Sequence, residues 1–100
     1  MDKYEILKNK LNNIIMHIDY MLENVEFQYE SSKEYLLKYK EFVEYRIEEV
    51  NNRTIPKSRG VKVLGLIRGL SDHDELCNND KLWKMVGDAD IYYKNECKKF

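Results

Sequence analysis

Apolar residues recur at alternating intervals of three and four along the first quarter of the chain. Such spacing places them on one face of an α-helix, as in the a and d positions of a coiled coil, while charged residues occupy mostly the opposite face. The three full heptads are formed by Tyr4, Leu7, Leu11, Ile14, Ile18, Met21 and Val25. We expect this seam to pack inside a helical bundle or between copies of the chain.

The seam weakens between residues 28 and 32 and resumes from Tyr35. No glycine or proline occurs before Pro56, so one continuous helix of about 50 residues would fit this stretch. The polar gap instead favours two antiparallel helices. Ser31 followed by Glu34 also has the spacing of a capping box, in which both side chains satisfy free backbone N–H groups at a helix start. Both arrangements stay open, and we expect the hairpin, with its turn at 28–32.

A linker follows at residues 53–60, where Pro56 disfavours helix in the residue before it. Residues 61–70 then have the spacing of a short helix, although their β-branched side chains also suit a strand. Gly65 and Gly69 lie one helical turn apart. We expect them to allow close contact with another helix.

Two further helix starts are predicted at 71–75 and 78–80, because side chains with oxygen atoms precede apolar residues there. In the last helix we expect Ile91, Tyr92 and Phe100 to point inward. Trp83, the only tryptophan, should anchor the C-terminal helices to the N-terminal ones.

The sequence therefore predicts one all-α domain over residues 1–100, a small helical bundle with a single modest core. Residues 1–52 form a heptad-patterned helix or a helical hairpin. The basic linker at 53–60 follows, and residues 61–100 form two or three shorter helices.

The composition argues against a disordered or a membrane-spanning chain. Charged residues make up 35% and hydrophobic residues 43% of the sequence, and no apolar run approaches the roughly 20 residues of a spanning helix. Two cysteines and no basic leader followed by an apolar run indicate a cytoplasmic protein. Abundant lysine and asparagine with a single alanine are typical of an AT-rich genome, such as that of a phage or mobile element.

The charge is unevenly distributed although the net charge is only −1. Residues 51–70 hold five cations and no acid, whereas the segments on either side are acidic. The five cations are Arg53, Lys57, Arg59, Lys62 and Arg68. Cations beside small hydrogen-bonding side chains can contact phosphates. The low net charge instead favours contacts within the protein or with a protein partner.

Candidate catalytic and metal-binding groups are weak. His73 and Cys77 share a helical face, but zinc sites usually show paired cysteines two to four residues apart, and none occur here. The acids around Cys77 would raise the pKa of its thiol, which disfavours a nucleophile. The clustered carboxylates of residues 72–75 suit helix capping. We therefore predict no catalytic residue, metal or cofactor.

Five aromatic residues fall between positions 29 and 45 and could stack bases. The helical spacing of three of them favours a packed core or a subunit seam instead. The residues are Tyr29, Tyr35, Tyr39, Phe42 and Tyr45.

Together these features predict a non-enzymatic binding protein, a regulator or inhibitor that acts by protein–protein interaction and self-associates through the apolar seam. The alternative is a small nucleic-acid-binding protein that contacts phosphates through the basic segment 53–68.

Overall fold

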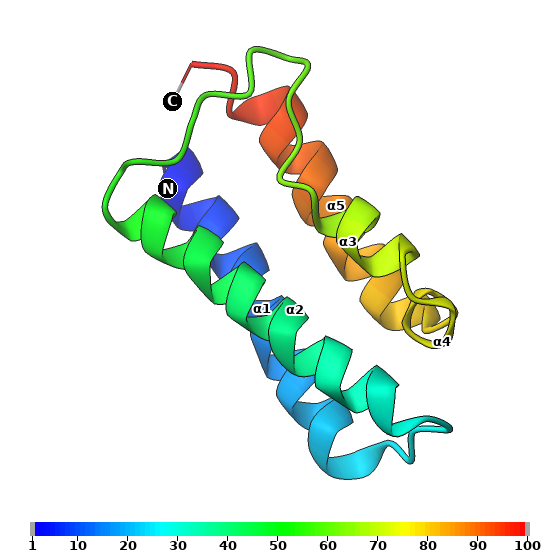
Figure 1. The fold of residues 1–100 in the computed structure, drawn as a ribbon. Helices are drawn as coiled ribbons and strands as arrows, with labels where there is room; N and C mark the ends of the chain where they lie inside the picture. Colours follow the sequence, from blue (N-terminus) through cyan, green and yellow to red (C-terminus); the bar gives the residue numbers. More distant parts are fainter. Residues whose placement is uncertain (1, 100) are drawn as a thin grey trace.

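The computed structural model describes residues 2–99 and is built from helices. Within this part of the chain there are five helices and no strand: α1 (Lys3–Asn24), α2 (Glu30–Asn51), α3 (Leu66–Ser71), α4 (Asp74–Cys77) and α5 (Asp80–Glu96). α1 and α2 form an antiparallel hairpin, α5 packs along α1, and α3 lies on α5 (Figure 1). The predicted all-α bundle is confirmed, and so is the hairpin.

The apolar seam of α1 lies at the centre of the core. Its buried members are Leu7, Leu11, Ile14, Ile18 and Met21, which are at most 2% exposed. Val25 lies just beyond the end of α1 and is 38% exposed, so it does not extend the seam. α2 and α5 cover the seam within one chain. The seam therefore packs inside the bundle, the first of the two expected arrangements, and offers no surface for packing between copies of the chain.

The turn between α1 and α2 occupies residues 25–29, slightly earlier than predicted. α2 begins at Glu30, and its N-cap residue, Tyr29, makes no side-chain hydrogen bond to the helix. The predicted capping box of Ser31 and Glu34 is therefore wrong, since both residues already lie inside the helix.

A carboxylate from α4 serves the start of α2 instead. Glu75 accepts a hydrogen bond from the backbone N–H of Gln28 at 2.7 Å and another from the hydroxyl of the buried Ser32. These bonds, led by that from Ser32, hold the pKa of the Glu75 carboxyl below its usual value. A helix start capped from a distant segment carries no local sequence signal.

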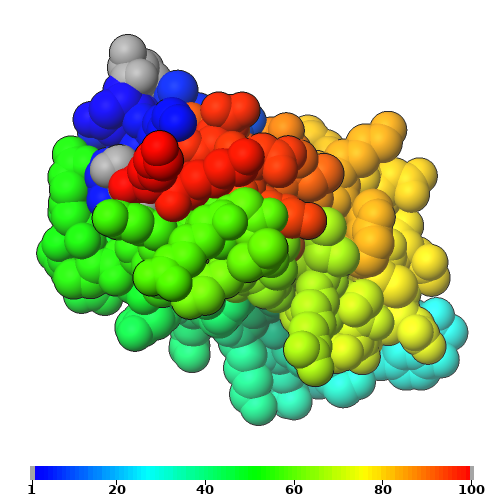
Figure 2. Space-filling view, turned by 90° about the horizontal axis from the view of Figure 1, so that it is seen from above, coloured from blue at the N-terminus to red at the C-terminus, as the bar shows by residue number. Residues whose placement is uncertain are grey.

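Residues 52–65 connect α2 to α3 and cross the end of the bundle where α5 ends (Figures 1 and 2). Ser58 is fully buried there. Its hydroxyl donates to the carbonyl of Lys94 at 2.7 Å, and its N–H donates to the carbonyl of Cys97, just beyond α5, at 3.1 Å. The hydroxyl of Tyr93 donates to the carbonyl of Pro56. These bonds attach the linker to α5.

The helix predicted over 61–70 begins only at Leu66, and residues 61–65 belong to the linker. Asp90 of α5 sets this start. Its buried carboxylate accepts from the backbone N–H groups of Leu64 at 3.1 Å, Leu66 at 3.4 Å and Ile67 at 2.9 Å. Gly65 adopts φ +85°, a conformation that favours glycine, so the chain can wrap this carboxylate. Burial raises the pKa of Asp90, although the three N–H groups oppose the shift.

α5 runs unbroken through Gly87. Its start confirms one predicted cap, since the Asn79 side chain accepts from the N–H of Leu82 at 2.9 Å. Ile91 was expected inward and is 59% exposed, and Trp83 is 36% exposed rather than an anchor. Phe100 lies outside the described residues. The helix buries another face, formed by Leu82, Val86, Ala89 and Tyr93.

Candidate functional site

The five cations of the basic segment are all exposed but do not form one patch. Arg53 turns toward α1, where its guanidinium lies 4.1 Å from the ring centroid of Tyr4 and 3.8 Å from the carboxylate of Asp2. Arg53 therefore contributes to the fold. Among the described residues, the other four form no ion pair: Lys57, Arg59, Lys62 and Arg68.

The C-terminal segment adds a further cation beside the linker. A Cβ atom at Gly60 would lie 3.4 Å from Cε of Lys98, so this side chain rests on the linker backbone. Figure 2 shows the C-terminal residues, in red, against the light-green linker. Lys57 and Arg59 are exposed on the same linker, so three cations lie on or against this segment.

An apolar groove of about 390 Å³ lies between α3 and α5. Its most accessible apolar side chains are Val63 and Ile91, which are 51% and 59% exposed. Asp90 forms part of the lining, but its carboxylate is engaged by backbone N–H groups. The complete lining is Val63, Ile67, Arg68, Ser71, Asp90, Ile91 and Lys94.

The two walls of this α3–α5 groove are in contact through Ile67 of α3. Its Cδ1 packs near Gly87 of α5, where a Cβ atom would lie 3.5 Å away, an ordinary van der Waals distance. The exposed side chains of Ile91 and Val63 and the half-buried Ile67 form an apolar surface beside polar residues, a feature that marks interaction sites on soluble proteins.

The rim of the α3–α5 groove is positively charged. Arg68 and Lys94 line it, and Lys62 precedes its wall residue Val63. None of the three forms an ion pair with another described residue. The nearest unburied acid of α5, Asp88, pairs with Lys10 of α1 at 2.6 Å and so belongs to the other flank of the helix.

A second groove, of about 740 Å³, lies on that other flank, between α1 and α5. Met16, 69% exposed, is its most accessible apolar residue. It carries one cation and no carboxylate in its lining, which consists of Asn13, Met16, His17, Tyr20, Lys81 and Met85. It therefore resembles the α3–α5 groove in apolar character and differs from it in charge.

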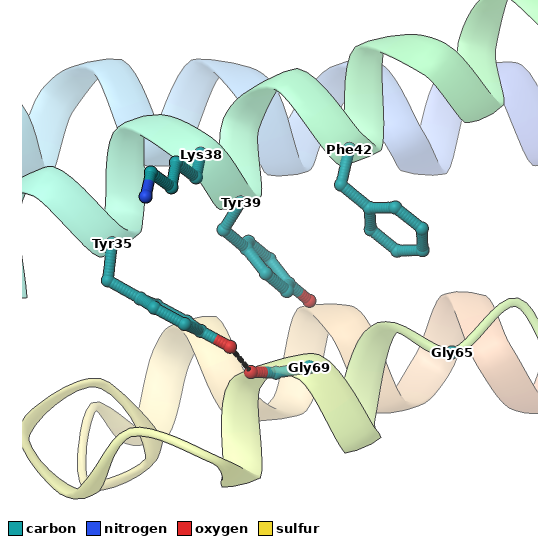
Figure 3. A pocket seen from close by; sticks show the side chains of 6 residues that line it. All are labelled: Tyr35, Lys38, Tyr39, Phe42, Gly65 and Gly69. Atoms are coloured by element: carbon teal, nitrogen blue, oxygen red, sulfur yellow. Dashed lines mark hydrogen bonds between the residues drawn. The ribbon is translucent and has the colours of Figure 1, made fainter.

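A smaller hollow of about 210 Å³ separates α2 from α3 (Figure 3). Tyr35 and Tyr39 point across it from α2, and their hydroxyls donate to the carbonyls of Gly69 and Leu66. A Cβ atom at Gly69 would lie only 3.2 Å from Cε1 of Tyr39. The prediction of close helix contact is confirmed for Gly69 but not for Gly65, which precedes α3. The ring of Tyr39, 4% exposed, packs in the core rather than offering a face to bases.

The groups with potential for chemistry lie in ordinary structural surroundings. Burial raises the pKa of the Cys97 thiol to about 11, which keeps it protonated. Cys77 donates from its sulfur to the carbonyl of Asp74 at 3.3 Å. Among residues 2–99, no three His, Cys, Asp or Glu side chains are grouped to hold a metal ion. None of the described helices is long and apolar enough to cross a membrane.

No protein-family model, curated protein or solved structure matches this chain. The functional argument therefore rests on the surface itself. Of the predicted cations, the structure places Arg68 in the lining of the α3–α5 groove. Lys62 precedes the lining residue Val63, and Lys57 and Arg59 lie near the C-terminal segment. Ile91 was missed as a surface residue, although the spacing of the buried residues of α5 places it off their face.

Proposed function

We propose that this chain is a non-enzymatic binding protein that regulates or inhibits another protein by direct contact through the α3–α5 face. The observation that supports this most is the combination of an exposed apolar groove with three cations that lack ion pairs. Protein interfaces join an apolar centre to a polar rim in this way. A cytoplasmic location and an origin in a phage or mobile element belong to the same proposal.

Affinity capture with two matched variants tests this function. Ile91→Glu and Met16→Glu each place a carboxylate at an exposed helical position, one in each groove of α5, so neither should disturb folding. From the lysate of a low-GC bacterium we expect the unchanged protein and Met16→Glu to capture a stoichiometric protein partner that Ile91→Glu loses. Capture of no stoichiometric partner, or equal capture by Ile91→Glu, would contradict the proposal.

Nucleic-acid binding is the second candidate, supported by the cations gathered around the linker. Lys57 and Arg59 lie on the linker on which Lys98 rests. Contact with phosphates predicts affinity for labelled DNA or RNA that falls steeply between about 50 and 200 mM salt. It also predicts that Lys57→Glu with Arg59→Glu abolishes this affinity. Flat anisotropy traces at both salt concentrations would leave the protein-binding function alone.

Self-association stays a prediction, now without the apolar seam as its interface. Sedimentation velocity of the unchanged protein tests it directly. A species of 12.1 kDa at all concentrations would exclude a homo-oligomer.

A further inference from the structure

We propose that the α3–α5 groove binds an acidic amphipathic helix of a partner protein. This inference rests on the proposed function and specifies the partner that the groove accepts. Three features of the groove support it: its length, its charge and the state of the backbone along its edge.

The length of the groove matches one turn of a helix. Its lining runs along α5 from Asp90 to Lys94 and along α3 from Ile67 to Ser71, in each case about 6 Å at 1.5 Å per residue. Apolar side chains at positions i and i+4 of a partner helix span the same distance. Two such side chains can therefore lie side by side in the groove, against Val63, Ile67 and Ile91.

The charge around the groove selects an acidic partner. Arg68 and Lys94 lie in the lining, Lys62 lies next to it, and none of the three is paired with a described acid. Asp90, the one carboxylate of the lining, is 3% exposed and accepts from three backbone N–H groups, so the charged groups that a partner can reach are the cations. The outer side of α2 is acidic and would repel the same partner. Its exposed acids are Glu30, Glu34, Glu41, Glu44 and Glu48.

The backbone along the groove edge disfavours a β-strand as the occupant. Strand addition needs free N–H and C=O groups on an extended edge. Residues 61–65 lie outside the helices, but the N–H groups of Val61 and Lys62 donate to the carbonyl of Ser58, and that of Leu64 donates to Asp90. A partner helix satisfies its own backbone and needs only apolar and charged side chains from the groove.

Synthetic peptides of about 18 residues, five helical turns, test the proposal. The first carries leucine at helical spacing and glutamate on both sides of that stripe. The second replaces each glutamate by lysine, and the third has the composition of the first in an order without an apolar face. Fluorescence anisotropy of each labelled peptide reports its binding.

We expect the acidic amphipathic peptide alone to bind. Its affinity should fall about tenfold or more in Ile91→Glu, and by a similar factor in Arg68→Glu with Lys94→Glu, while Met16→Glu binds normally. The charge-reversed double variant should bind the lysine peptide instead, which a misfolded protein would not do. Equal binding of the scrambled peptide, full affinity of Ile91→Glu, or no binding of the acidic peptide would each overturn the inference.

The outcomes distinguish a failure of this inference from a failure of the proposed protein-binding function on which it rests. If the acidic peptide fails while Ile91→Glu still loses its captured partner, the protein-binding function stands and the helical, acidic partner is wrong. If the peptide fails and Ile91→Glu captures its partner normally, both proposals fail.

Discussion

The N-terminal hairpin and the C-terminal half of this molecule are held by different kinds of contact. In the hairpin, apolar residues at regular spacing, such as Leu11 and Ile14, are buried between helices. In the linker and α3, single polar side chains bind backbone groups, as Ser58 and Asp90 do. The second mode fixes an irregular segment in place and leaves two of its apolar residues, Val61 and Val63, on the surface. The candidate site lies there.

Removing one side chain from the hairpin should have the largest effect on stability. Leu11→Ala leaves a cavity in a fully buried position, and we expect a loss of about 3 kcal/mol in the free energy of unfolding. Urea denaturation followed by circular dichroism measures it. A loss below about 1 kcal/mol would show that the seam is not the main source of stability.

Removing the carboxylate of Asp90 should loosen one segment rather than the whole fold. In Asp90→Ala the N–H groups of Leu64, Leu66 and Ile67 lose their acceptor, so we expect a loss of about 2 kcal/mol. Their amides should exchange faster with solvent deuterium while those of α1 keep their protection. Asp90→Asn retains one acceptor oxygen and should lose less. Uniformly faster exchange in α1 as well would contradict a local role.

One buried and one exposed tyrosine of α2, Tyr39 and Tyr45, offer a matched pair of variants. Tyr39→Phe removes the hydrogen bond to the carbonyl of Leu66 and should cost about 1 kcal/mol. Tyr45→Phe removes an exposed hydroxyl from the same helix and should change stability by about zero. Thermal unfolding of both proteins measures the difference. Equal effects would mean that the hydroxyl of Tyr39 does not attach α3 to α2.

Acid should weaken the contact between α4 and the start of α2. The pKa of Glu75 is lowered in the folded protein, so its contribution is complete above the ordinary value of about 4.5 and is lost as the pH falls through the folded pKa. Glu75→Gln should therefore flatten the decrease of the melting temperature between about pH 5 and pH 3. Asp90, with its raised pKa, should act in the opposite direction and destabilise as it ionises. A variant curve parallel to that of the unchanged protein would contradict the role of Glu75.

These two modes explain which features could be predicted from the sequence. The hairpin follows from apolar spacing, and the Asn79 cap from a local pattern. The roles of Asp90 and Glu75 depend on backbone groups far along the chain, which no local pattern reports. For this reason the start of the helix predicted over 61–70 was wrong, since Asp90 and Gly65 together set it at Leu66.

The candidate site was predictable only in part. The basic segment indicated a charged surface, but the structure assigns Arg53 to the fold and Arg68 to the groove. The apolar half of the groove arises where α3 lies against α5. The sequence pattern of the last helix predicted Ile91 to be buried. The groove depends on how α3 and α5 pack together, so the sequence alone did not predict it.

The most direct test of the central claim is to locate binding by NMR with the acidic amphipathic peptide. We predict that the methyl signals of Val63, Ile67 and Ile91 shift during the titration, while that of Met16 stays in place. Shifts at Met16 on the α1–α5 flank, or none at the α3–α5 groove, would contradict the claim that this groove is the binding surface.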